Sequence, residues 1–215
     1  MSERRAVTLC GERLCEPGHI CAFFDSQAEQ YEILAPYYQE GIEQGEQVVT
    51  IVDRGQVADH EQRLRRHGIA VDEALANGRL KIYASEDTYT IGGGFAAERM
   101  YDVLQGALAR AQREGWRVRT SGVMDWAYRG HAGTEQLMEY EARVNVLLPI
   151  YDCTLLCVYD LDRLDARKVM DVLATHPFVI HRREILKNPY YRPPVELLEE
   201  MLLRPTAATP TRIRA

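Results

Sequence analysis

Three aspartates follow apolar runs that are typical of buried strands, namely Asp25, Asp125 and Asp160. Carboxylates that converge at one edge of a sheet could hold Mg²⁺ and activate water, which would make the chain a metal-dependent hydrolase. The same carboxylates could instead orient an organic molecule that binds between apolar side chains. A serine nucleophile is not expected, because Ser121–Gly122 does not complete a Gly-x-Ser-x-Gly elbow.

Glu141 lies on the apolar face of a helix that the sequence predicts over residues 134–148. A carboxylate in that position needs a hydrogen bond or a charge partner, because an unpaired buried charge is very costly. A structural pair would use Arg119, Arg143 or another nearby base; otherwise Glu141 belongs to a binding site. Asn145 follows one turn later, so both side chains could address one ligand or one backbone loop.

Five cysteines raise the question of zinc binding or a reactive thiol; they are at positions 10, 15, 21, 153 and 157. Cys153 and Cys157 fall in a strand and its lead-in, where side chains diverge, and the other spacings also fit zinc knuckles poorly. We therefore expect reduced, buried thiols and assign no metal ligand. Whether any of the five is redox-active or binds a metal is left open by the sequence.

Two histidines stand at the borders of predicted strands. His176 lies between a helix and a strand and precedes Pro177, where a histidine often bonds the last carbonyls of the helix. His19 lies at the entering end of the first core strand, away from the edge where a ligand would bind, so we expect a structural role. The sequence leaves any further role of His19 open.

The first core strand, residues 19–24, leads directly into a helix from Gln27. In nucleotide-binding α/β proteins this junction carries a glycine-rich loop that ends in lysine, because backbone N–H groups and a cation must contact phosphates. Here the junction has no glycine and no lysine. The Gly92–Gly94 run also lacks a following lysine and fits a hinge or lid better. The pattern predicts binding or sensing without a nucleotide, and we expect no cofactor.

Strands alternate with helices along the chain, which predicts an α/β fold with three layers: a mainly parallel sheet with helices on both faces. The predicted strands cover residues 19–24, 47–52, 80–84, 118–124, 154–159 and 176–180. The predicted helices cover residues 27–44, 56–67, 72–76, 95–114, 134–148, 165–174 and 195–203. Pro36 should bend or divide the first helix, and Pro149 should end the fifth.

Ligands of such sheets bind outside the carboxyl ends of the strands. Phe24, Met124, Trp126 and Tyr159 would supply apolar walls there, while Glu141 and Asp160 would orient the ligand. The full set of expected ligand-binding residues is Phe24, Asp25, Met124, Trp126, Glu141, Cys157, Tyr159, Asp160 and His176.

Size and charge limit the class of protein. The 215 residues have 46% hydrophobic content and a net charge of -6, which fits one globular domain and argues against direct nucleic-acid binding. No apolar run is long enough for a membrane span or a signal peptide, so we expect a cytoplasmic protein. We expect an N-terminal extension at 1–13, a single sensory domain at 14–204 and a flexible tail at 205–215.

Several motifs occur together and in order, at residues 17–24, 41–46, 122–126, 140–145, 157–160 and 176–191. With these motifs the chain resembles, over about residues 14–200, the MEDS family, a sensory domain named for methanogens, methylotrophs and a dichloromethane-responsive regulator. The resemblance implies a RecA/KaiC-like fold that has lost its phosphate-binding loop. It also implies small-molecule sensing, often in chains that carry a helix-turn-helix or a histidine kinase.

The combined expectation is a non-catalytic sensor that binds a small, partly apolar organic ligand at the carboxyl edge of the sheet. The chain has no room for a separate output domain, so the signal would pass to a partner protein, a histidine kinase or a transcription regulator, or through a change in a homo-oligomer. One alternative is a ligand-free interaction module that docks on a kinase or regulator. The other is the Mg²⁺-dependent hydrolase.

Overall fold

A seven-stranded sheet forms the centre of the computed structural model, which describes residues 6–15 and 18–203. The strand order is β5-β4-β6-β7-β3-β8-β9, and only β9 runs antiparallel to its neighbour among the described strands of this sheet. The predicted flexible tail at 205–215 and Glu16–Pro17 lie outside the described residues. The expected α/β fold with a mainly parallel sheet is confirmed.

The central strands are buried along their whole length because helices cover both faces of the sheet. In β3 and β7 every residue is buried, and the two strands pair with Cys21 opposite Cys157 and Phe23 opposite Tyr159. The strands are β3 His19–Phe23, β4 Gln47–Val52, β5 Leu80–Ala84, β6 Val118–Val123, β7 Thr154–Tyr159, β8 Phe178–His181 and β9 Glu184–Lys187.

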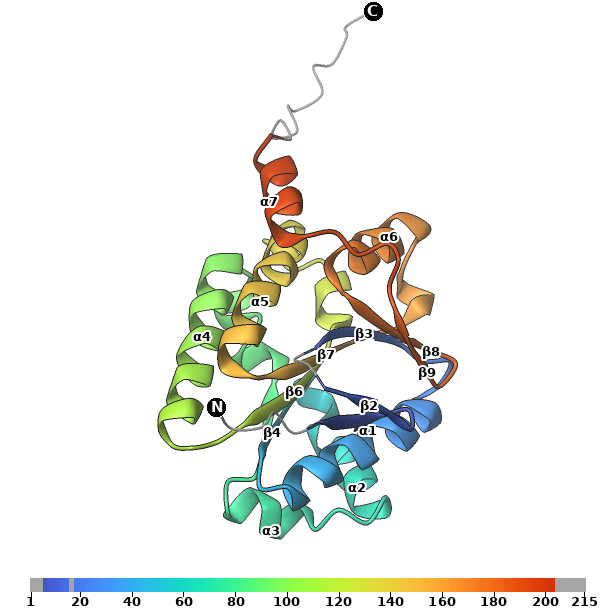
Figure 1. Cartoon of the computed structure of the whole chain (residues 1–215), viewed down its shortest axis with the longest axis vertical. Helices are drawn as coiled ribbons and strands as arrows, with labels where there is room; N and C mark the ends of the chain where they lie inside the picture. Colours follow the sequence, from blue (N-terminus) through green and yellow to red (C-terminus); the bar gives the residue numbers. More distant parts are fainter. Residues whose placement is uncertain (1–5, 16–17, 204–215) are drawn as a thin grey trace, which may run out of the picture.

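Two helical layers enclose the sheet, α1–α3 on one face and α4–α6 on the other (Figure 1). The helices are α1 Gln27–Glu43, α2 Val57–Arg66, α3 Val71–Ala76, α4 Ala97–Arg113, α5 Leu137–Tyr151, α6 Ala166–Thr175 and α7 Pro194–Leu203. Short 3₁₀ turns connect them, namely η1 Arg54–Gln56, η2 Ser85–Asp87, η3 Ile91–Gly93, η4 Asp125–Tyr128, η5 Thr134–Gln136 and η6 Leu161–Arg163. None of the helices in the described part of the chain has the length and apolar character of a membrane span.

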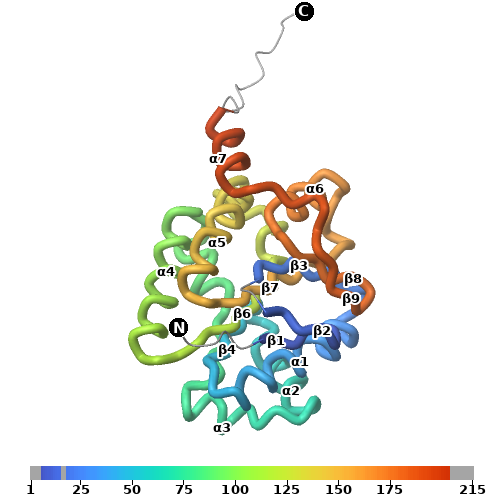
Figure 2. Tube along the Cα trace, in the orientation of Figure 1, coloured from blue at the N-terminus to red at the C-terminus, as the bar shows by residue number. Residues whose placement is uncertain are grey.

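A small hairpin precedes the main sheet and lies beside α1 (Figure 2). It consists of β1 Val7–Leu9 and β2 Glu12–Leu14, joined at Cys10 and Gly11. Both turn residues have positive φ, as a two-residue hairpin turn requires. The buried side chains of β1 join the core on the α1 face, so part of the predicted N-terminal extension packs on the sheet domain.

The structure differs from the local predictions at four places. Pro36 does not divide α1, because burial of the neighbouring residues 33–35 and 37–38 outweighs one missing backbone hydrogen bond, and a bend at Pro36 stays a prediction. Pro149 does not end α5, which continues to Tyr151 and stops at Asp152 in a left-handed conformation. The sixth strand of the prediction starts at Phe178 instead of His176, and the short edge strand β9 was not predicted.

Candidate functional site

At the junction between β3 and α1, where a nucleotide-binding protein would bind phosphate, side chains of this chain hydrogen-bond the backbone N–H groups. Ser26 caps α1 and its Oγ accepts a hydrogen bond from the Glu29 N–H at 3.2 Å. The Glu29 carboxylate accepts in turn from the Asp25 N–H at 2.7 Å. These bonds form a capping arrangement in which the Asp25 and Glu29 N–H groups are already bonded to side chains. Phosphate at this junction would also meet the acidic side chains of Asp25 and Glu29.

A cleft of about 420 Å³ opens at the carboxyl ends of the central strands. This is the edge at which open α/β sheets bind ligands, as the sequence predicts. Four of the predicted site residues line it, namely Phe24, Asp25, Tyr159 and Asp160. The remaining lining residues come from neighbouring strand ends and from α1, α2 and adjoining turns: Ser26, Gln27, Gln30, Tyr31, Val52, Gln56, Asp59, Val123, Asp125, Val158, Leu161 and Asp162.

Carboxylates dominate the charged groups of this cleft. Asp160 caps η6 by accepting from the Asp162 N–H at 3.0 Å, and its Oδ2 lies 3.2 Å from Arg163 Nε. Arg163 also approaches Asp125, with 3.8 Å between Nε and Oδ2. Burial raises the pKa of Asp125; Arg163 opposes that shift, while Asp160 and Asp53 add to it. The cleft therefore disfavours anionic ligands.

The three strand-end aspartates Asp25, Asp125 and Asp160 all line this one cleft, as the hydrolase alternative requires. They do not form a compact ligand group. In the described part of the chain, the side chains whose ligand atoms all lie within 4.8 Å of one another are His19, Glu141, Cys157 and His176. Mg²⁺ binding by the aspartates stays a prediction.

Met124 and Trp126 lie in the core on the α4–α6 face and do not line the cleft. Their exposed fractions are 0% and 1%. The chain turns inward at η4, and the Trp126 indole stacks on Tyr89 with 4.8 Å between ring centroids. The apolar and aromatic side chains that line the cleft are Phe24, Tyr31, Val52, Val123, Val158, Tyr159 and Leu161.

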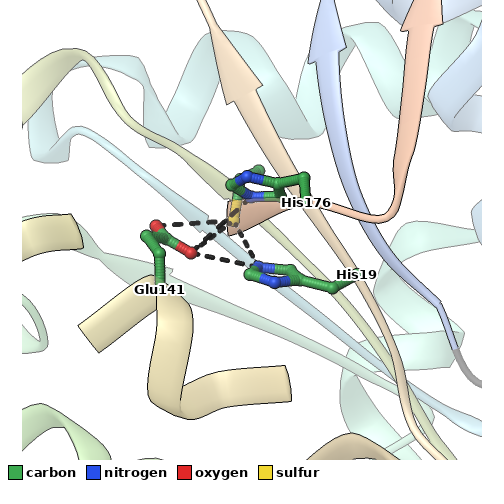
Figure 3. Close-up of side chains that lie close together, drawn as sticks. His19, Glu141 and His176 are labelled. Atoms are coloured by element: carbon green, nitrogen blue, oxygen red, sulfur yellow. Dashed lines mark hydrogen bonds and ion pairs between the residues drawn. The ribbon is translucent and has the colours of Figure 1, made fainter. Parts of the chain in front are cut away.

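Glu141 lies at the centre of a buried polar cluster between the sheet and α5 (Figure 3). Its Oε2 is 3.0 Å from His19 Nε2, 3.5 Å from Cys157 Sγ and 3.7 Å from His176 Nε2. The Tyr159 hydroxyl donates to Oε1 at 3.3 Å. The cluster thus joins β3, α5, β7 and the segment between α6 and β8.

Neither arginine that the sequence nominates as a partner pairs with Glu141. Arg119 lies on the opposite face of the sheet, with Nε 2.5 Å from Glu46 and Nη1 2.9 Å from Glu40. Arg143 Nη1 binds Glu98 at 2.5 Å near the protein surface. The helix rotation that buries Glu141 turns Arg143 away from it. The third possibility, another nearby base, is the one found, since His19 Nε2 lies 3.0 Å from Glu141 Oε2.

Burial sets the protonation preferences of the cluster. It raises the pKa of Glu141 and of the Cys157 thiol. It lowers the pKa of His19 and of His176 to about 3. Burial therefore favours the uncharged form of all four groups.

A second layer of hydrogen bonds positions the cluster. Asn145 Nδ2 donates to the Thr175 carbonyl at 2.8 Å and to the Glu141 carbonyl at 3.0 Å. Of the two roles expected for Asn145, the structure therefore shows hydrogen bonding to the backbone. His176 Nδ1 lies 2.8 Å from the Val172 carbonyl of α6. The prediction that His176 bonds the end of a helix is confirmed.

His19 is the functional candidate that sequence reasoning missed. It shares one face of β3 with Cys21, and Cys157 is paired with Cys21 on the adjacent strand. The two-residue period of strands therefore places His19 on the same side of the sheet as Cys157. That alternation was readable from the sequence, but the strand pairing was not.

Comparison with known proteins identifies both a family and a fold. Residues 18–177 match the family model MEDS, described as the MEthanogen/methylotroph, DcmR Sensory domain. A crystal structure of a KaiC-like protein from the hyperthermophilic archaeon Pyrococcus horikoshii OT3 superposes with a TM-score of 0.56 at 12% identity, covering 77% of this chain and 72% of that chain. This likeness shows a KaiC-like fold. No curated protein matches the chain at a significant level.

Proposed function

Because the chain belongs to the MEDS family of sensory domains, we propose that it binds a small, partly apolar organic molecule in the strand-end cleft and signals to a partner protein. In this proposal the role is sensory and non-catalytic. Membership of the family implies the sensory role; the ligand, the cleft as its site and the partner are our inference.

The position of the cleft is the main support for the proposal. It lies beside the β3–α1 junction, where related folds bind phosphate and this chain has Phe24, Asp25 and the Ser26–Glu29 cap. Its volume of about 420 Å³ suits a small organic molecule. Its valines and Phe24 favour an apolar portion of the ligand, and its carboxylates favour a neutral or cationic polar group.

The last helix supports an output through protein contact. α7 packs on α5, which carries Glu141, and projects from the body of the molecule (Figure 1). It exposes 65% of Val195, 86% of Leu202 and 83% of Leu203. Apolar side chains at this exposure are suited to a partner surface such as a histidine kinase, a transcription regulator or a second copy of the chain.

A ligand screen by thermal unfolding tests the proposal. The panel contains small neutral and cationic organic molecules with an apolar portion. A ligand at about 100 times its Kd stabilises the folded state by about 2.7 kcal/mol, which raises the unfolding midpoint by several degrees. Absence of stabilisation by any compound in a broad panel would contradict ligand binding.

Substitutions of cleft residues then test where the compound binds. Phe24→Ala and Asp160→Asn should each weaken its affinity, because both residues line the cleft. Asp102→Asn, on the exposed surface of α4, is the matched control and should leave the affinity unchanged. A partner that is captured equally well with and without the compound would favour the interaction-module alternative.

A further inference from the structure

We propose that His19, Glu141, Cys157 and His176 bind one first-row transition-metal ion, with Zn²⁺ as the best fit. The four side chains offer two imidazole nitrogens, one sulfur and one carboxylate oxygen, all within 4.8 Å of one another. This mixture of borderline and soft donors suits Zn²⁺ and not Mg²⁺ or Ca²⁺, which prefer oxygen ligands. The proposal reverses the expectation from the cysteine spacing, which assigned no metal ligand.

Several distances between the ligand atoms fall in the range expected for the edges of a tetrahedron around such an ion, and one is shorter. Zn–N and Zn–O bonds of about 2.0–2.1 Å and a Zn–S bond of about 2.3 Å give edges of about 3.3–3.7 Å. Cys157 Sγ lies 3.5 Å from both His19 Nε2 and Glu141 Oε2. The edge from Glu141 Oε2 to His176 Nε2 is 3.7 Å and that to His19 Nε2 is 3.0 Å. The His19–Glu141 edge would have to lengthen by about 0.3 Å when the ion binds.

The Nε2 atom of His176 carries a free lone pair that is directed at the cluster. His176 Nδ1 lies 2.8 Å from the Val172 carbonyl, which can only accept, and 2.9 Å from Thr175 Oγ1. The Thr175 hydroxyl itself donates to the Val172 carbonyl at 2.9 Å, so we assign the ring proton to Nδ1, which leaves Nε2 bare. Nε2 is buried and has no hydrogen-bond partner. A buried acceptor in this state costs free energy, and metal coordination would supply its missing partner. A backbone carbonyl on the opposite ring nitrogen is the usual way to orient a metal-binding histidine.

Glu141 also has an orienting contact. The Tyr159 hydroxyl donates to Oε1 at 3.3 Å and leaves Oε2, the oxygen closest to the other three groups, free to bind the ion. Tyr159 lines the cleft as well, so one side chain contacts both regions. The metal proposal depends only on the residues of the buried cluster. It can be tested whether or not an organic ligand binds in the cleft.

Four buried protein ligands describe a closed site without an open position for substrate, which is typical of structural zinc. The ion would tie β3 and β7 to α5 and to the segment before β8. Because the ligands are inaccessible, an ion bound there would exchange slowly and would leave only when the protein opens.

Metal analysis of the full chain tests the proposal. Protein produced in zinc-supplemented medium and purified without chelator should contain about one Zn²⁺ per chain by mass spectrometry. Cys157→Ser should lower that ratio at least fivefold. Cys153→Ser is the matched control, because Cys153 is equally buried but lies outside the cluster, and it should retain the ion.

Cobalt gives a second measurement that requires no variant. The wild-type chain, unfolded with chelator and refolded with Co²⁺, should show thiolate-to-cobalt charge-transfer absorption and tetrahedral d–d bands. Refolded protein with cooperative unfolding but neither bound Zn²⁺ nor these bands would overturn the proposal and leave a metal-free hydrogen-bonded cluster. Equal metal loss in Cys157→Ser and Cys153→Ser would overturn the assignment of the ligands.

Discussion

His19 Nε2 lies 3.0 Å from Glu141 Oε2, and this contact connects the first strand of the sheet to the helix that covers it. The two residues are far apart in the sequence, and their exposed fractions are 2% and 0%. A polar pair buried to this degree restricts how β3 and α5 can pack, because any shift would leave a polar group without a partner. The strand-end cleft lies nearby and shares Tyr159 with the cluster.

Nucleotides should not bind at the β3–α1 junction. The Asp25 and Glu29 N–H groups are already bonded to side chains, and the cleft carries carboxylates that repel phosphate. ATP with Mg²⁺ at millimolar concentration should leave the thermal midpoint unchanged, with Mg²⁺ alone as the control. A nucleotide-specific rise in the midpoint would contradict this interpretation of the junction.

Gly41→Ala should destabilise the fold by about 1–3 kcal/mol, because a Cβ there would lie 2.6 Å from the buried Arg119 side chain and 2.9 Å from Val48. Gly106→Ala, in α4, is the control: its Cβ would meet no atom within 4 Å, and it should stabilise the helix by about 0.5–1 kcal/mol. Urea unfolding measures both free energies. Equal effects of the two substitutions would show that Arg119 does not pack on α1 as described.

The order of strands and helices was predictable from the sequence because each core strand is a β-branched or apolar run with helical signals on either side. β4, β5 and β7 begin and end at the predicted residues. β9 has one half-buried residue among exposed ones, so it carries no clear apolar pattern. Its existence depends on pairing with β8, which the local sequence does not specify.

The candidate site was predictable only in part. The carboxyl-edge rule, which depends on strand direction alone, nominated Phe24, Asp25, Asp125, Tyr159 and Asp160, and all five line the cleft; that they bind a ligand stays a prediction. It failed to foresee that η4 turns Trp126 into the core, since the direction of a side chain after a strand depends on the local turn. The burial of Glu141 was evident from helical periodicity, whereas its partners depend on which strands become neighbours.

Acid should destabilise the protein partly through His60. Burial lowers the pKa of His60 to about 4, and its Nδ1 lies 2.6 Å from the Tyr31 hydroxyl, with Asp59 opposing the shift. The unfolded chain binds the proton more tightly, with a pKa of about 6.5, so stability is complete above that pH and is lost as pH falls towards 4. The full loss from this residue is on the order of 3 kcal/mol.

His60→Gln provides the comparison, because glutamine can bond Tyr31 without titrating. Unfolding free energies of both proteins, measured in urea across this pH window, should show a shallower acid dependence for the variant. Parallel pH profiles would mean that the acid sensitivity arises at other groups.

The cysteines should differ widely in reactivity. Cys15 is exposed, whereas Cys21, Cys153 and Cys157 are buried. Burial, together with the charge of Glu29, raises the pKa of Cys10 to about 11. Iodoacetamide should therefore modify Cys15 first and the three buried thiols only after unfolding in guanidinium, as peptide mass spectrometry can follow. Rapid modification of Cys157 in the folded protein would conflict with its described burial.

A crystal structure of the chain with a compound that stabilises it tests the sensory proposal most directly. The account predicts electron density for the compound in the strand-end cleft, in contact with Phe24 and beside Asp160. Density for the compound at another place on the molecule, with the cleft filled only by water, would contradict the account.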